Sequence, residues 1–107
     1  MLRFREMDAF VERVVRRLRS EPGFSRNRHF AAFSSAEGRR ALRIHRHLRS
    51  IERDLSAGST ATLDRGDGRF ALTLRSPRGG HRTAFLTSSE FRILCTNPLV
   101  RSALGMA

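Results

Sequence analysis

The sequence predicts an α+β fold with two N-terminal helices, a three-stranded antiparallel β-meander and one or two short C-terminal helices. Three observations predict it. Apolar residues recur with helical spacing through the first half of the chain, their period changes to two after Gly58, and helix-capping sequences return after Thr87. At 107 residues the chain can support one core, and we expect one face of the sheet to be covered by helices.

We therefore expect a single domain over residues 1–107. Its parts are a helical, arginine-rich segment over 1–58, the meander over 59–87 and the C-terminal helices over 88–105. Hydrophobic residues make up 39% of the chain, which is enough apolar material to offset the entropy of ordering it.

The first helix is predicted from about Phe4 to Arg19, where Glu21-Pro22-Gly23 follows as a stop signal. Acidic residues come early in this segment and arginines come late, so the charges complement the helix dipole and the arginines have a structural explanation. The apolar stripe that should face the core consists of Met7, Phe10, Val11, Val14, Val15 and Leu18.

The connection over 24–34 contains no acidic residue, and its length favours a short helix around 28–33. Ser34 and Glu37 then stand three positions apart, as a capping box requires. A second helix follows and ends at Gly58. Its narrow apolar seam consists of Ala41, Ile44, Leu48, Ile51 and Leu55.

Alternation of apolar and polar residues predicts three strands. Two of them, within 60–63 and 69–75, flank the hairpin turn Gly66-Asp67-Gly68, and a third run covers 82–86. Thr87 to Glu90 again has capping-box form and opens a short helix. Asn97-Pro98 ends that helix and can begin another, because Asn caps well and Pro is tolerated at the first helical position.

Two local resemblances bear on the C-terminal half. The nine residues 86–94 (LTSSEFRIL) look like the strand-to-helix junction of response-regulator winged-helix domains, but the thirteen residues that follow are too few for the recognition helix and wing of that family. The order helix, three strands, helix resembles double-stranded RNA-binding domains in topology. Those domains begin their last helix with basic residues, where this chain has Ser88, Ser89 and Glu90, so no functional residue is carried over.

The charge balance is one-sided, with 21 basic residues against 10 acidic ones and a formal net charge of +11. Such a surface attracts polyanions. Every basic residue is Arg, which indicates a compositional preference for Arg over Lys. That preference does not explain a two-to-one excess of cations over acids.

The densest positive surface is predicted on the second helix, off its apolar seam. The candidate nucleic-acid-binding residues there are accompanied by one acid, Glu52, and we expect help from the preceding connection; the full set is Arg26, Arg28, Arg39, Arg43, Arg46, Arg49 and Arg53. The alternative interpretations are a solvated helix face or arginines paired to acids elsewhere. The leading hypothesis is a small DNA- or RNA-binding protein, and the second is an interaction module, possibly homodimeric, that docks an acidic protein.

Other chemistry is weakly supported. The residues that could stack on nucleic-acid bases are Phe24, Phe30 and Phe33. His45 and His47 are two apart, whereas helical metal pairs need three or four. Neither a nucleophile elbow nor a phosphate-cradling loop occurs, so we expect no enzyme, no metal and no cofactor.

The single cysteine, Cys95, precludes an internal disulfide and reads as a buried small hydrophobe. No apolar run approaches the roughly 20 residues that span a bilayer, and the first residues lack a signal-peptide pattern. These features predict a cytoplasmic protein with no membrane contact.

Overall fold

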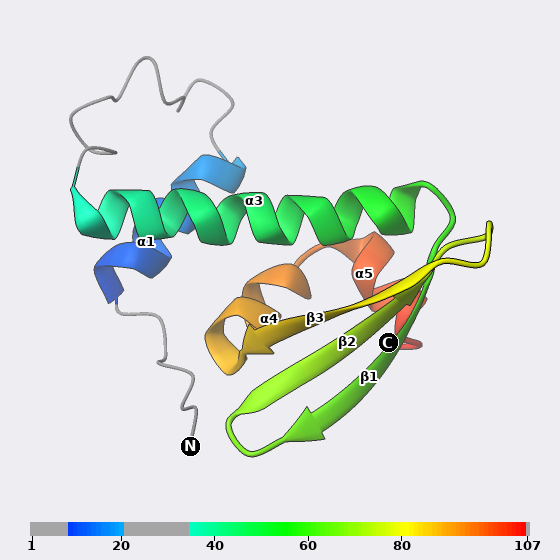
Figure 1. Cartoon of the computed structure of the whole chain (residues 1–107). Helices are drawn as coiled ribbons and strands as arrows, with labels where there is room; N and C mark the ends of the chain where they lie inside the picture. The colour runs from blue at the N-terminus through cyan, green and yellow to red at the C-terminus, as the bar shows by residue number, and fades with distance from the viewer. Residues whose placement is uncertain (1–8, 21–34, 107) are drawn as a thin grey trace. The chain divides into compact units, whose positions relative to one another are not determined.

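The computed structural model describes residues 9–20 and 35–106 and has the α+β fold and element order that the sequence predicts (Figure 1). The helices and strands are α1 (Ala9–Ser20), α3 (Ala36–Ser56), β1 (Thr60–Gly66), β2 (Arg69–Arg75), β3 (His81–Thr87), α4 (Ser88–Leu94) and α5 (Pro98–Ala103). The predicted helix around 28–33 and the predicted start of the first helix at Phe4 lie outside the described residues. Contacts divide the chain into two units between His47 and Leu48, within α3, and each unit is described by itself.

Helix α1 buries a narrower stripe than its sequence predicts. Val11 and Val15 are fully buried, while Val14 and Leu18 are half-buried. The prediction that Phe10 faces the core is wrong, because Phe10 is 48% exposed. At about 100° per residue, Phe10 lies about 120° around the helix from the middle of the Val11–Val15 stripe, which takes it out of the core.

The N-terminus of α3 is capped one residue later than predicted. The Oγ atom of Ser35 accepts a hydrogen bond from the backbone N–H of Gly38 at 3.0 Å, so Ser35 is the capping residue and Glu37 is not its reciprocal partner. The predicted capping residue, Ser34, lies outside the described residues. A one-residue shift is a natural outcome where two serines precede the helix, since either hydroxyl can serve as a cap.

The seam of α3 is confirmed in full. Its five apolar residues are all buried: Ala41, Ile44, Leu48, Ile51 and Leu55. The chain leaves the helix through Gly58, whose φ of 99° is a left-handed conformation that suits glycine.

The three strands form an antiparallel sheet in the order β1-β2-β3. The register places Leu72 of the central strand between Leu63 of β1 and Ala84 of β3. The β1–β2 hairpin turns through Asp67 and Gly68, as predicted, and the φ of 71° at Gly68 explains the glycine. Both outer strands extend beyond their predicted runs.

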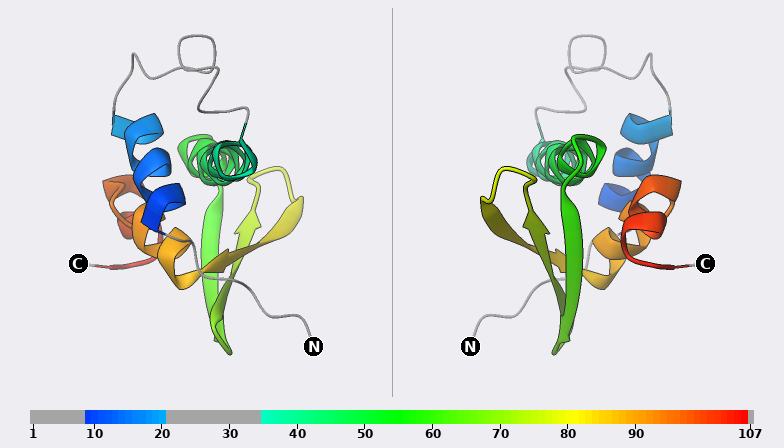
Figure 2. Two further views of the ribbon diagram at one scale, coloured as in Figure 1. Left: turned by 90° about the vertical axis from the view of Figure 1, so that its left-hand side faces the viewer. Right: turned by 90° about the vertical axis from the view of Figure 1, so that its right-hand side faces the viewer.

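One face of the sheet is covered. The buried residues of this face belong to the unit that contains residues 48–107. Leu72, Leu74, Ala84 and Leu86 are 0–3% exposed. Helix α4 contacts β2 and β3, and α4 and α5 lie on the same side of the sheet (Figure 2). At one end of this face Phe70 stacks on Phe91 of α4 with ring centroids 4.4 Å apart.

At the other end of the covered face, β3 is joined to the C-terminal half of α3. Arg82 Nε donates to Asp54 Oδ2 and Arg82 Nη2 donates to Ser50 Oγ, each at 2.9 Å. The guanidinium group of Arg82, at the edge of the apolar face, is thus paired with the carboxylate of Asp54.

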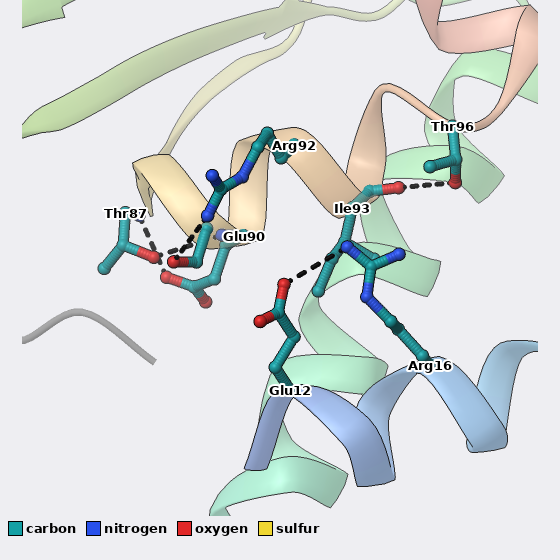
Figure 3. A network of polar contacts seen from close by, with 8 residues as sticks. Glu12, Arg16, Thr87, Glu90, Arg92, Ile93 and Thr96 are labelled. Atoms are coloured by element: carbon teal, nitrogen blue, oxygen red, sulfur yellow. Dashed lines mark hydrogen bonds and ion pairs between the residues drawn. The ribbon is translucent and has the colours of Figure 1, made fainter. Parts of the chain in front are cut away.

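The two C-terminal helices begin as predicted. Thr87 Oγ1 accepts from the backbone N–H of Glu90, and Glu90 Oε1 accepts from that of Thr87, so the capping box is complete (Figure 3). Asn97 caps α5 by accepting from the N–H of Leu99, with Pro98 in the first helical turn. The side-chain amide of Asn97 also donates to Glu52 Oε2 at 2.6 Å, which ties the start of α5 to α3.

Candidate nucleic-acid interface

Five of the seven predicted contact residues lie on one side of α3, and each is exposed: Arg39, Arg43, Arg46, Arg49 and Arg53. We call these five the arginine face. At about 100° per residue they fall within about 120° of the helix circumference, directly opposite the buried seam. The seam sets the orientation of the face, because every residue about half a turn away from it must point to solvent.

The two carboxylates in the C-terminal half of α3 bind other groups. Asp54 binds Arg82, and Glu52 accepts from Asn97. Among residues 9–20 and 35–106, no carboxylate lies within ion-pair distance of any of the five arginines. Pairing within the described part of the chain therefore does not account for them.

Arg16 of α1 behaves differently. Arg16 Nη2 lies 3.1 Å from Glu12 Oε1, one helical turn earlier, as Figure 3 shows. This is an i,i+4 pair of the kind that stabilises helices locally. The early-acid, late-arginine order of the sequence predicted a structural use for these residues, and this pair is such a use.

Arg49 and Arg53 also line a shallow cavity of about 310 Å³, which includes Glu52, Asn97 and Leu99. The remaining predicted contact residues, Arg26 and Arg28, lie outside the described residues, as do the stacking candidates Phe24, Phe30 and Phe33.

Sequence reasoning missed the second face of the sheet, opposite the face that α4 contacts. Phe85 projects from β3 onto this face and is 45% exposed, and the guanidinium carbon of Arg69 lies 5.0 Å from the centre of its ring. The signal was present in the alternation of β3, because Phe85 stands between Ala84 and Leu86, both of which are buried.

A cavity of about 590 Å³ lies between the end of α3 and the β2–β3 loop. His81 and Asp54 both line it, together with Arg78 and Arg82. The carboxylate of Asp54 is already bound to Arg82, and no nucleophile is oriented toward His81 by any contact in the described structure. His29, which could join His81 in a catalytic pocket, lies outside the described residues.

Within the described ranges, no three His, Cys, Asp or Glu side chains gather as metal ligands would. Cys95 is half-buried, less than its apolar neighbours in sequence suggested, and its Sγ lies 3.9 Å from Met106 Sδ. Burial raises the pKa of the Cys95 thiol and Arg101 partly opposes that rise, so the group is a poor nucleophile near neutral pH.

Comparison of the chain with protein-family models, with curated proteins and with solved structures finds no match. Across the described residues, no helix has both the length and the apolar content to cross a bilayer. The functional argument therefore rests on the surfaces themselves.

Proposed function

We propose that this protein binds nucleic acid, chiefly through phosphates, and that the arginine face of α3 makes the main contact. One observation carries the proposal: five exposed arginines share one side of a helix, with no carboxylate partner in the described structure. Unpaired guanidinium groups in water keep their full capacity for charge-assisted hydrogen bonds to phosphate oxygens.

The spacing supports a linear polyanion. Arg39 and Arg53 are fourteen positions apart on one continuous helix, which is about 21 Å of helix axis at about 1.5 Å per residue. A nucleic-acid strand presents a phosphate about every 3.4 Å along a duplex axis, so several phosphates come within reach of the face. A contact of this kind positions the protein without reading sequence.

An acidic protein partner is the competing interpretation, because carboxylates would bind the same guanidinium groups. The regular spread of cations along a rod favours a uniform polyanion over a folded acidic surface. Copurification with a stoichiometric protein at high salt, without nucleic acid in the ultraviolet spectrum, would favour the protein partner. The chain contains no Trp or Tyr, so bound nucleic acid would dominate its absorbance.

The test is the salt dependence of binding to fluorescently labelled DNA and RNA, followed by anisotropy. Binding should be readily measurable at about 50 mM salt and fall steeply toward about 200 mM. Replacing Arg43 and Arg46 by Gln should weaken binding and reduce the slope of log K against log salt by about 1.5, because two phosphate contacts are lost.

The matched control replaces Arg13 and Arg16 of α1 by Gln. This pair has the same three-residue spacing, also sits on a helix and removes the same charge. It should leave the slope nearly unchanged. No binding at about 50 mM salt, or equal losses in both double variants, would overturn the proposal, since the second result would mean that net charge alone attracts the nucleic acid.

A further inference from the structure

The cavity between the end of α3 and the β2–β3 loop combines an apolar wall with cationic groups. Its volume of about 590 Å³ lies within the range of about 300–1,000 Å³ that is typical of small-molecule sites. A Cβ atom at Gly58 would lie 3.4 Å from Pro77 Cγ, so the α3–β1 turn and the β2–β3 loop approach each other closely beside it. The lining includes three apolar and three charged residues: Ala57, Leu74, Pro77, Asp54, Arg78 and Arg82.

Arg82 is held in a fixed position on one wall of this cavity. Its Nε atom donates to Asp54 Oδ2 and its Nη2 atom donates to Ser50 Oγ, each at 2.9 Å. A guanidinium group has five N–H donors, and the described residues offer no acceptor to the other three. The side chain is 40% exposed, so a ligand oxygen can reach these donors. Little further freedom is lost when such a group binds a ligand.

The β2–β3 loop supplies a second guanidinium group from an ordered backbone. The N–H of Ser76 donates to the carbonyl of Gly80 at 2.7 Å, and the N–H of Gly79 donates to the carbonyl of Ser76 at 3.0 Å. The N–H of Arg78 donates to Ser76 Oγ at 3.1 Å. The side chain of Arg78 is exposed, and no carboxylate among the described residues pairs with it. Arg78 therefore remains available to bind an anionic group.

We propose that this cavity binds a nucleoside monophosphate, with the phosphate on Arg78 and the nucleoside against the apolar wall beside Arg82. Two guanidinium groups against one carboxylate favour an anion, and guanidinium groups bind phosphate well. The apolar wall favours a ligand with a ring over a bare phosphate. The Asp54–Arg82 pair offers an acceptor and donors, which suit the hydroxyl and amino groups of a nucleoside.

This site is separate from the arginine face, because none of those five arginines lines the cavity. The inference therefore does not depend on the proposed function. A free mononucleotide and the phosphorylated end of a strand present the same chemistry, and the experiment below separates these two sources.

Calorimetric titration with AMP tests the site. AMP should bind saturably, while inorganic phosphate and adenosine, which each carry one half of the ligand, should bind at least about tenfold more weakly. In an amide NMR titration the shifts should be confined to residues around 54–59 and 76–82, which frame the cavity. Absence of AMP binding would overturn the inference. Equal binding of AMP and inorganic phosphate would also overturn it, because the apolar wall would then contribute nothing.

Arg78→Gln should weaken AMP binding at least about tenfold, because the phosphate loses a charge-assisted contact. Arg75→Gln is the matched control: Arg75 is exposed on the same strand–loop segment and carries the same charge, but it does not line the cavity. Its affinity for AMP should stay within about twofold, since a separate exposed charge is screened by salt. Equal losses in the two variants would contradict the proposed site.

Gly80→Val tests the cavity without removing a charge. A Cβ atom at Gly80 would meet no other atom within 4 Å, so the loop accepts a side chain there. By strand alternation that side chain would lie on the same side as Arg82 and narrow the cavity that Gly80 lines. AMP binding should weaken while the urea midpoint stays close to that of the unchanged protein. Unaltered AMP affinity would place the nucleotide elsewhere and overturn the inference.

A last comparison separates this site from the arginine face. The double variant with Arg43→Gln and Arg46→Gln should bind AMP as well as the unchanged protein does. If that variant loses AMP while Arg78→Gln retains it, the nucleotide binds on the arginine face, and the cavity inference fails while the proposed function stands. In the same double variant, displacement of AMP by a short 5′-phosphorylated oligoadenylate identifies a strand end as the source. Failure of that displacement identifies the free mononucleotide, and either result supports the site.

Discussion

The two faces of the sheet are built from the same three strands and differ in almost every property of their side chains. On the covered face, Leu72 and Leu86 are fully buried. On the opposite face, Thr83 is exposed and Phe85 is 45% exposed, although each lies one position from a buried residue of β3. Because neighbouring side chains of a strand point in opposite directions, stability and surface chemistry can be changed separately along one strand.

The largest expected effect is on the covered face. Leu72→Ala should lower the free energy of unfolding by about 3 kcal/mol, because Leu72 is fully buried on the central strand and its loss leaves a cavity. Urea denaturation followed by far-ultraviolet circular dichroism measures this. A loss below about 1 kcal/mol would mean that the covered face is loosely packed and that the contrast between the faces is smaller than the burial indicates.

A smaller effect is expected where β3 passes into α4. By strand alternation Thr87 belongs to the face opposite the covered one, yet its side chain is 4% exposed because it caps α4. Thr87→Ala should cost about 1 kcal/mol in unfolding free energy, since the N–H of Glu90 loses its acceptor. Thr87→Ser retains a hydroxyl and should retain most of that stability. Equal losses in both variants would show that the methyl group of Thr87, and not the cap, matters.

The fold was predictable because each element carries its own local signal. The seam of α3, the Asp67-Gly68 turn and the caps at Thr87 and Asn97 are all set by residues within a few positions of one another. The errors occurred where tertiary packing chooses between local options. The sequence allows Phe10 to belong to a wide apolar stripe, but only the narrower stripe of Val11 and Val15 is fully buried.

The candidate site was predictable in part for the same reason. The arginine face follows from helical periodicity once the seam is known. Phe85 was not singled out because β3 offers an apolar residue to each face, Leu86 to one and Phe85 to the other. The pairing of Ala84 with Leu72 decides which set is buried, and that register is a non-local property of the sheet.

The smallest expected effect is on the face opposite the covered one. Phe85→Ala should change the unfolding free energy by no more than about 0.5 kcal/mol, because the ring is already half in water; the diagonal contact with Arg69 is one of the contacts it loses. The same urea titration measures this change, and comparing it with the loss in Leu72→Ala gives the direct contrast between the two faces. A cost above about 2 kcal/mol would mean that Phe85 is held on the surface by packing.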